Sequence, residues 1–493
     1  MAHEHGTADH ATTYGTAILG AGLGGLGMAM RLRAAGDSSF VILEKADRVG
    51  GTWRDNVYPG AACDVQSHLY WFSFDRQPDW SRLYPLQPEI QANIERLTAE
   101  HGIAPHIRFN TEVAEVRWEP DAALWRLRSA AGEEFQARTV VAAWGQLNRP
   151  KFGIPGVEDF AGDWFHSARW RHDVALDGRR VACVGNGPSA AQLIPEIAPK
   201  AARLLVFQRS PNYVVPRLDR PYDEAERRMF LAEPDRYFES REGFYQEHET
   251  WHGAMRQGTE TAAAFTAAAR AQLEMQVADP VLRERLWPDY PIGCKRIIIS
   301  DDFYPALARP NVELVTEAIE RVEPSGIRTA DGRLHELDVI AYATGFETNS
   351  FLGPVEVVGR GGQTLREAWR NGPEAYLGMS IAGFPNFFML YGPNTNLGHN
   401  SILLMLECQY DYVLQAMRAS REAGRALDVR PEVMASFNRD LQDALRGSSF
   451  AGKCSSWYKT RDGRITNNWS GSVEDYKART ALFVPTEYDS VTS

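Results

Sequence analysis

Two glycine-rich turns constrain this chain most, because each joins an apolar strand to a helix. In the first, "GTAILGAGLGGLGMAMRLRAAG", an apolar run at 16–19 leads into Gly20, Gly22 and Gly25, spaced as G-x-G-x-x-G, and then into an apolar helical stretch. The next predicted strand, "FVILEKA", reaches Glu44, 19 residues after the last glycine. This context predicts a dinucleotide site, in which backbone amides approach a pyrophosphate and the carboxylate accepts hydrogen bonds from ribose hydroxyls.

The segment "RRVACVGNGPSAAQLIPEIA" repeats the pattern, with Gly185, Gly187 and Ala190 in the glycine positions. Its second strand, "RLLVFQRS", places Arg209 where the first unit has an acid. A carboxylate there would repel a 2′-phosphate, whereas a guanidinium binds one through paired hydrogen bonds. The first unit is therefore expected to bind FAD and the second NADPH.

Composition narrows the class of protein. The chain has 493 residues and a formal net charge of -11, which argues against a nucleic-acid footprint and against an anionic membrane surface as partner. No apolar run approaches the roughly 18 residues needed to span a bilayer. Residues 1–15 are polar, without the apolar core of a secretory signal, and we expect a disordered tail. A cytoplasmic protein is predicted.

The five cysteines are scattered and odd in number, and none belongs to a C-x-x-C pair. This distribution fits a reducing cytoplasm and predicts no structural zinc or other metal site. It also argues against the flavin disulfide reductases, which carry two dinucleotide folds but need a redox-active cysteine pair. Cys63 has no second cysteine near it in the sequence.

The patterns predict an α/β protein with two Rossmann-like dinucleotide-binding domains and a helical insertion. We expect a helix at 83–102, a small antiparallel sheet from about 107 to 129, and a strand at 139–145 that returns to the main sheet. "NVELV" (311–315) and "DVIAYATG" (338–345) are expected to bring the chain back to the first domain. The predicted domains are an FAD-binding domain at 16–148 and 335–493 and an NADPH-binding domain at 149–334, with the helical insertion at about 222–286.

Two further segments resemble the type I Baeyer–Villiger monooxygenases. "GGTWRDNVYPGAACD" (50–64), followed by "HLYWFSF", is similar to the family's flavin-contact segment. "FAGDWFHSARW" matches its linker fingerprint, with Phe160, Gly162, His166 and Trp170 at the family spacing. Arg171 departs from the Pro or Asp that usually follows the Trp. The resemblance covers nearly the whole chain, from residue 16 to about residue 469.

The resemblance implies an enzyme that uses FAD and NADPH to insert one oxygen atom of O2 into a ketone through a flavin peroxide, giving an ester or lactone. In "PIGCKRIIISDDFY", Arg296 matches the catalytic arginine and Lys295 a contact to the 2′-phosphate of NADPH. Asp64 matches the carboxylate that orients the arginine. The alternatives are oxidation of sulfur or nitrogen by the same flavin chemistry, a flavoprotein without enzymatic activity, and a plain buried salt bridge between Asp64 and Arg296.

Other positions are predicted to contact the cofactors. "GPNTNLGHNSI" opens an amphipathic helix from residue 401, with several Asn as candidate caps, and its N-terminus is expected to point at the flavin pyrimidine. A C-terminal loop around "CSSWY" is expected to fold over NADPH. Besides Asp64, Lys295 and Arg296, the positions predicted to bind cofactors are Gly51, Thr52, Trp53, Tyr70, Val113, Ser189, Gln192, Ser210, Asn396 and Trp457.

The linker segment is too polar for a buried strand and has no helical period. The resemblance implies that it joins two domains that move while NADP stays bound. Phe160 and Trp170 are expected to pack into opposite sides. His166 is interpreted either as a hinge or latch residue or as a hydrogen-bonded histidine that anchors a loop.

Overall fold

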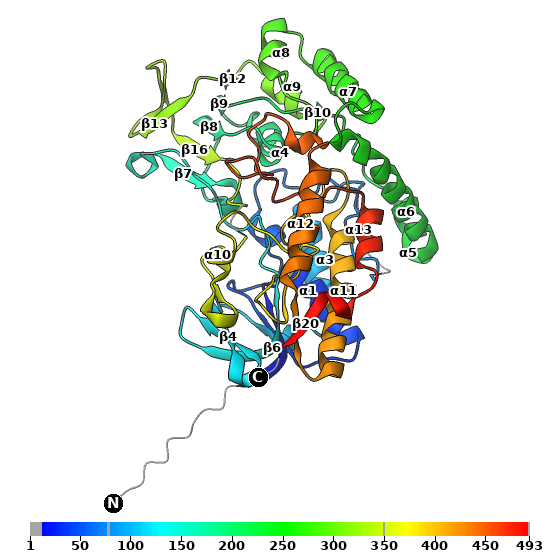
Figure 1. The fold of residues 1–493 in the computed structure, drawn as a ribbon. Helices are drawn as coiled ribbons and strands as arrows, with labels where there is room; N and C mark the ends of the chain where they lie inside the picture. The colour runs from blue at the N-terminus through cyan, green and yellow to red at the C-terminus, as the bar shows by residue number, and fades with distance from the viewer. Residues whose placement is uncertain (1–11, 76–78, 349–350, 492–493) are drawn as a thin grey trace, which may run out of the picture.

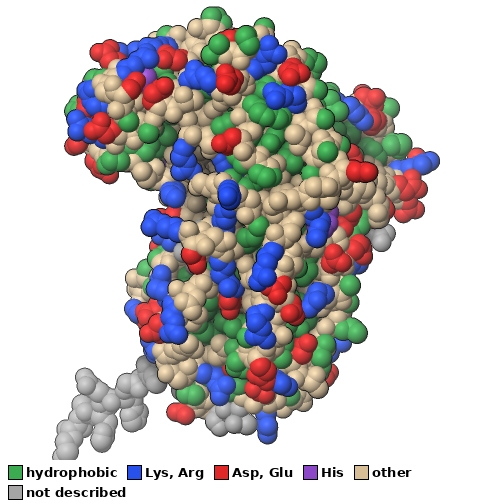
Figure 2. Space-filling model, turned by 45° about the horizontal axis from the view of Figure 1, so that its top comes forward, with side chains coloured by type: hydrophobic (Ala, Val, Ile, Leu, Met, Phe, Trp, Pro, Cys, Tyr) green, Lys and Arg blue, Asp and Glu red, His purple; other side chains and the backbone are tan. Residues whose placement is uncertain are grey.

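The computed structural model describes residues 12–75, 79–348 and 351–491. The expected tail therefore lies mostly outside the described residues, but its end does not, because strand β1 already begins at Thr13. Figure 1 shows one sheet region in the lower part of the molecule and a second one above it. In Figure 2 the two parts appear as lobes joined by a narrower waist, along which Lys and Arg side chains gather.

The first sheet has eight strands in the order β17-β4-β5-β6-β1-β2-β3, with β18 also paired to β6. Strand β6 changes partners along its length. It pairs with antiparallel β5 over residues 134–137 and with parallel β18 over 140–142, while β1 lies on its other side. The expected antiparallel strands are thus part of the main sheet, and the predicted return at 139–145 is confirmed. The strands are β1 (Thr13–Leu19), β2 (Phe40–Leu43), β3 (Ile107–Arg108), β4 (Val113–Glu119), β5 (Leu124–Ser129), β6 (Glu134–Ala142), β17 (Glu356–Val358) and β18 (Phe387–Met389).

The second sheet is entirely parallel, in the order β12-β9-β8-β16-β7. It corrects one expectation, because "NVELV" and "DVIAYATG" form β12 and β16 of this sheet and do not return the chain to the first one. Every residue of β16 is buried, as expected for a strand with a neighbour on each side and cover on both faces. The strands are β7 (Asp163–His166), β8 (Arg180–Val184), β9 (Arg203–Phe207), β12 (Val312–Val315) and β16 (Val339–Tyr342).

The segment "FAGDWFHSARW" contains β7, which is the edge strand of the second sheet and is only partly buried, so the expectation excluded a fully buried strand but did not anticipate this one. An edge strand needs only one paired neighbour, which a polar sequence can supply. Phe160 packs on the sheet face that carries Val184, whereas Trp170 stacks edge-on against Phe165 on the other face, with 4.8 Å between ring centroids. The two aromatics therefore lie on opposite faces of one sheet.

The chain crosses between the two sheets at residues 149–151 and 345–347. These crossings pair with each other: the backbone N–H of Lys151 donates to Gly345 and that of Glu347 to Arg149. The physical connection between the lobes is therefore a short two-stranded ladder and not the segment at 160–170.

The helices cover both sheets, and the predicted helical insertion is confirmed at α5–α8, which run down one side of the molecule in Figure 1. The predicted helix at 83–102 is α3. No helix in the described parts of the chain is long and apolar enough to cross a membrane. The helices are α1 (Leu23–Ala34), α2 (Thr52–Asp55), α3 (Gln87–Glu100), α4 (Pro188–Ile197), α5 (Glu224–Ala232), α6 (Pro234–Thr250), α7 (Glu260–Gln276), α8 (Pro280–Leu286), α9 (Phe303–Leu307), α10 (Leu365–Ala368), α11 (Ile402–Ala423), α12 (Pro431–Leu445) and α13 (Val473–Thr480).

Seven short strands complete the described fold. Strands β13, β14 and β15 form a small antiparallel sheet beside the second one, and β10 pairs with β11 and β19 with β20. Their bounds are β10 (Val214–Val215), β11 (Ile298–Ile299), β13 (Ile319–Glu323), β14 (Gly326–Thr329), β15 (Leu334–Glu336), β19 (Ala426–Val429) and β20 (Tyr488–Val491).

Candidate active site

The first glycine turn follows β1 and opens α1. Gly20 has φ +106°, and a Cβ there would lie 2.9 Å from the Ala143 carbonyl oxygen. A Cβ on Gly25 would lie only 1.9 Å from the Gly20 carbonyl, so the helix approaches the turn more closely than any side chain allows. Helix α1 begins after Gly22 without a side-chain cap. Its first N–H groups are therefore left available to an anionic ligand.

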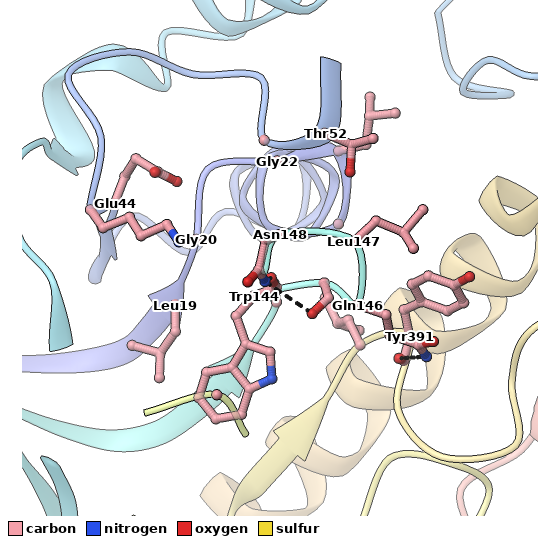
Figure 3. Close-up of a pocket in the computed structure, with 18 of the residues that line it drawn as sticks. Leu19, Gly20, Gly22, Glu44, Thr52, Trp144, Gln146, Leu147, Asn148 and Tyr391 are labelled. Atoms are coloured by element: carbon pink, nitrogen blue, oxygen red, sulfur yellow. Dashed lines mark hydrogen bonds between the residues drawn. The ribbon is translucent and has the colours of Figure 1, made fainter. Parts of the chain in front are cut away.

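A cavity of about 270 Å³ lies in front of this turn (Figure 3). Gly25 supports the turn from behind and does not line the cavity. Asp64, Arg296, Asn396 and Trp457 are not part of its wall either. The predicted residues that line it are Gly20, Gly22, Glu44, Gly51, Thr52, Trp53, Tyr70 and Val113.

Glu44 is held by several donors at the cavity wall. Its Oε2 accepts from the Ala21 backbone N–H at 2.7 Å, and its Oε1 accepts from Ala46 N–H at 2.9 Å and from Arg54 Nη1 at 3.0 Å. The Glu44 and Arg54 side chains are 5% and 7% exposed, so this is a buried ion pair. The sequence reading did not anticipate Arg54, whose charge offsets that of Glu44.

Several lining residues besides Arg54 were missed from the sequence, among them Trp144, Gln146, Leu147, Asn148 and Tyr391. The first four directly follow β6, and the tendency of ligands to bind beyond the carboxyl ends of parallel strands could have found them. Gln146 Nε2 donates to the Tyr391 carbonyl at 3.0 Å, while its buried Oε1 has no partner among the described residues. Gln146 lines the cavity wall, so this buried acceptor without a partner is a candidate contact for a ligand N–H group.

Asp64 and Arg296 form the predicted pair. Asp64 Oδ2 accepts from Arg296 Nε at 2.9 Å and Nη2 at 2.5 Å, and the two side chains are 26% and 28% exposed. Burial would raise the pKa of the Asp64 carboxyl, but the charges of Arg296 and, less strongly, Arg217 hold it below its usual value. The carboxylate in turn raises the pKa of Arg296. The pair therefore stays ionised, with arginine N–H groups left over for another acceptor.

The phenols of Tyr391 and Tyr458 lie within electrostatic reach of this pair. Tyr391 also lines the cavity, as does Tyr70, which accepts a hydrogen bond from Trp53 Nε1 at 3.2 Å. The Asp64–Arg296 pair therefore lies near the part of the cavity wall that contains Tyr70 and Tyr391. Asn396 does not line the cavity but holds Tyr391 in its wall, because its Oδ1 accepts a hydrogen bond from the Tyr391 hydroxyl at 2.7 Å.

The second glycine turn follows β8 and opens α4. Gly185 has φ +114°, and a Cβ there would lie 2.4 Å from the Ala343 carbonyl oxygen. Helix α4 starts after Gly187 without a side-chain cap, and Ala190 is fully buried. Ser189 is half-buried on the first turn of this helix. The second turn therefore presents the same uncapped helix end as the first.

Three predicted residues meet beyond β9. Lys295 Nζ donates to Ser210 Oγ at 2.5 Å, and burial followed by the charge of Arg209 lowers the pKa of Lys295 to about 8. Arg209 is exposed and has no ion-pair partner in the described parts of the chain. Two cations held close together, with only the weaker influence of Asp289 acting against their repulsion at Lys295, fit an anionic ligand group.

Gln192 is engaged within the protein. Its Oε1 accepts from the Tyr58 hydroxyl at 2.8 Å, and its Nε2 donates to the Ala62 carbonyl at 3.0 Å. The side chain thus fastens α4 to the segment that leads to Asp64. It connects the two glycine units directly.

The asparagines before α11 do not cap it as expected. The cap is Ser401, whose Oγ accepts from the Leu403 N–H at 3.3 Å. Asn400 instead accepts from the Ser401 N–H, and Asn394 Nδ2 donates to two carbonyls at 465 and 468. These side chains fix the loop before the helix.

His166 and Gly162 have clear structural reasons. A Cβ on Gly162 would lie 2.4 Å from the Asp338 carbonyl oxygen. His166 Nδ1 accepts from the Ala168 N–H at 3.1 Å, so its Nε2 donates to the Gly345 carbonyl at 3.0 Å. Burial lowers the pKa of His166 to about 4, which keeps the ring neutral. The histidine therefore braces β7 against the crossing at 345–347.

The structure corrects the expectation from cysteine spacing, because Cys294 and Cys454 form a disulfide. Cys63, Cys183 and Cys408 are free. Trp457 follows three residues after Cys454 and packs on Tyr458, with 4.6 Å between ring centroids. A separation of 160 residues hid this pairing in the sequence.

Comparisons with known proteins agree with this geometry. Sequence models of an NAD(P)-binding Rossmann-like domain and of L-lysine 6-monooxygenase/L-ornithine 5-monooxygenase match residues 18–85 and 99–221. A Baeyer-Villiger monooxygenase of Streptomyces coelicolor is 42% identical over 476 residues, covering 96% of this chain and 92% of the relative. One from Pseudomonas aeruginosa is 41% identical over 481 residues, covering 97% and 91%.

Solved structures are similar over the same length. A closed crystal structure of cyclohexanone monooxygenase superimposes with a TM-score of 0.88 at 29% identity, covering 98% of this chain and 100% of that one. An oxidized steroid monooxygenase bound to NADP gives 0.87 at 32% identity, with the same coverage.

Proposed function

The chain belongs to the Baeyer–Villiger monooxygenase family, and from this premise we propose which of its residues carry the activity. It is an FAD- and NADPH-dependent enzyme that inserts one oxygen atom of O2 into a ketone to give an ester or lactone. The ion pair of Asp64 with Arg296 carries the proposal, because it places a fixed cation within electrostatic reach of Tyr391 in the wall of the cavity.

FAD is held by the first glycine turn and the cavity in front of it. The uncapped end of α1 receives the pyrophosphate, Glu44 the ribose, and Gln146, whose Oε1 has no partner within the described protein, an N–H of the ring system. Bound FAD supplies the activation of O2, and bound NADPH supplies the electrons.

NADPH is held by the second turn. Helix α4 receives its pyrophosphate, and Arg209, Ser210 and Lys295 receive the 2′-phosphate. A phosphate that joins this cluster accepts charge-assisted hydrogen bonds and offsets the repulsion between the two cations. The cluster therefore selects NADPH over NADH.

Arg296 stabilises the negative charge that forms on the reacting oxygens. Asp64 occupies two of its donors and fixes the guanidinium plane, and the remaining N–H groups can donate to the oxyanion formed at the ketone carbonyl. Because the pair is only about a quarter exposed, few waters compete for these donors. Asp64 is the orienting group and Arg296 the group that contacts the reacting atoms.

The decisive experiment replaces Arg296 by alanine. Loss of one oxyanion donor typically slows the affected step by about a hundred- to a thousandfold. Arg296→Ala should still be reduced by NADPH, because Arg209, Lys295 and the Gly185 turn remain. It should release hydrogen peroxide and form almost no ester, and Asp64→Ala should behave similarly but more mildly. Rapid-mixing absorbance measures flavin reduction, and product analysis from a ketone measures oxygen insertion.

Arg179→Ala is the matched control. Arg179 pairs with Asp163 at 3.0 Å with similar exposure, but it directly precedes β8 of the second sheet and does not line the cavity. The control should keep both flavin reduction and ester yield. A normal ester yield from Arg296→Ala would remove this residue from the mechanism, and retained sulfide oxidation with loss of ester would separate the two oxygenation chemistries.

A further inference from the structure

Cys294 immediately precedes Lys295 and Arg296, so its disulfide with Cys454 ties the proposed catalytic segment to a distant part of the chain. Their Cα atoms are 6.2 Å apart, a separation that a disulfide spans without moving the backbone. Cys294 is fully buried and Cys454 is 8% exposed, within an apolar cluster that includes Tyr213 and Ile292. The cross-link therefore lies inside the protein, at the edge of the site.

Cys454 belongs to residues 447–459, a segment that we call the C-terminal strap. Its N-terminal end lies on the helical insertion, where Gln257 Nε2 donates to the Ser448 carbonyl at 3.1 Å. Its middle packs on the cross-link: a Cβ on Gly452 would lie 2.9 Å from Cys294 Sγ. Lys459 Nζ donates to the Gly452 carbonyl and folds the strap back on itself.

The strap also reaches the catalytic pair. Tyr458 is 1% exposed, and its phenol lies within electrostatic reach of Arg296 and Asp64. The strap is thus coupled to the segment 294–296 twice, once covalently through the disulfide and once electrostatically between Tyr458 and Arg296. Breaking the disulfide leaves only noncovalent contacts to keep the strap in place.

We propose that the Cys294–Cys454 disulfide is a reversible covalent clamp that holds the C-terminal strap closed over the Lys295–Arg296 segment. It forms when two thiols give up two electrons and two protons to hydrogen peroxide, which becomes two waters. It opens when a dithiol returns two electrons and two protons and itself becomes a disulfide. The clamp rests on the proposed function, because it acts on the same Arg296 site.

The clamp should change how often the strap opens. A disulfide that closes a long loop shifts such an equilibrium by at least about tenfold. With the disulfide intact, the Tyr458 phenol stays within electrostatic reach of Arg296, and the pair stays only about a quarter exposed to water. With the disulfide reduced, the strap lifts more often, so more NADPH is consumed without ester formation.

Thiol counting tests the cross-link itself. The chain has five cysteines and three are free, so alkylation of the denatured, peroxide-treated protein should label three thiols before dithiothreitol and five after it. Cys454→Ser should label four under both conditions, since Cys294 loses its partner. Five labelled thiols in the peroxide-treated protein before reduction would overturn the proposal.

Limited proteolysis with trypsin tests the clamp without any substrate. In the presence of NADP, the reduced protein and Cys454→Ser should be cleaved at Lys453 or Lys459 at least about tenfold faster than the oxidised protein. Cys408→Ser removes a free thiol of α11 and is the matched control, which should stay redox-sensitive like the unmodified chain. Equal cleavage of the oxidised and reduced forms would overturn the clamp.

Coupling gives the functional readout. Ester formed per NADPH consumed should fall severalfold on reduction and in Cys454→Ser, while flavin reduction stays fast. If no ketone is oxygenated but cleavage still depends on the disulfide, the proposed function fails and the clamp stands. If oxygenation is normal and independent of the disulfide, the clamp fails and the function stands.

Discussion

The two glycine units begin alike and end differently. Both join a parallel strand to a helix whose first turn has no side-chain cap, and both turn through a glycine with positive φ. At the matching position after the next strand, Glu44 is buried and shares its charge with Arg54 and backbone N–H groups. Arg209 is exposed and lies beside a second cation, Lys295.

The difference teaches what each unit needs from its ligand. In the first unit the charge of Glu44 is already balanced by Arg54, so the site suits a ribose that brings no charge of its own. The second holds two cations together and becomes favourable when a dianionic group arrives. Substitutions at Glu44 should therefore affect the protein itself, whereas substitutions at Arg209 should affect only its choice of coenzyme.

The largest effect is expected from Glu44→Ala. It leaves Arg54 buried with Asp55 as its remaining carboxylate partner, and breaking a buried pair costs about 3 kcal/mol at the lower end of the usual range. Urea unfolding should show this loss, and gel filtration should show release of FAD. Arg209→Ala should do neither, and a fully stable Glu44→Ala that retains FAD would end the contrast between the units.

His166 should make the second unit acid-sensitive. Its pKa is about 4 in the folded protein, below the ordinary value of about 6.5, because the ring is buried. Between these two pH values His166 therefore binds a proton in the unfolded chain but stays neutral in the folded protein. His166 then lowers the free energy of unfolding by about 3 kcal/mol as the pH falls from about 6.5 to 4.

His166→Gln should remove this part of the pH dependence. FAD should stay bound in this variant and also in Trp170→Ala. Denaturant titrations at several pH values measure the difference from the unmodified chain. An identical slope in both proteins would show that His166 titrates normally. Slower turnover with normal stability would favour its role as a latch at the crossing.

Arg209→Ala should raise KM for NADPH by about ten- to a hundredfold, because one charge-assisted contact is lost, and should change NADH use little. Arg203→Ala is the matched control, since Arg203 lies at the other end of β9 and pairs with Glu313. Steady-state kinetics with both coenzymes measure the effect. Equal weakening of NADPH and NADH would contradict the assignment of the 2′-phosphate site.

The smallest effect is a pH dependence. The pKa of Lys295 is lowered to about 8, so its charge is present below that pH and lost above it. KM for NADPH should rise as the pH increases through about 8, by up to about tenfold. Lys295→Arg keeps its charge and should flatten the profile. An unchanged profile in that variant would assign the titration to another group.

Local patterns of the sequence predicted the two turns, the helical insertion and the contrast between Glu44 and Arg209. These features depend on residues less than about 30 positions apart, where strand, turn and helix follow from glycine geometry and apolar spacing. The resemblance to a family added Asp64 and Arg296, which no local pattern connects. The structure brings these two side chains within hydrogen-bond distance.

Only the tertiary structure decided which strands share a sheet and which distant side chains meet. Strands β7 and β16 joined the second sheet because β16 pairs with β7 and with β8, which lie 176 and 158 residues before it in the chain. The same packing placed Gln146 against Tyr391 and Cys294 against Cys454. Such contacts follow from how whole layers pack, whereas a single sequence records mainly the preferences of near neighbours along the chain.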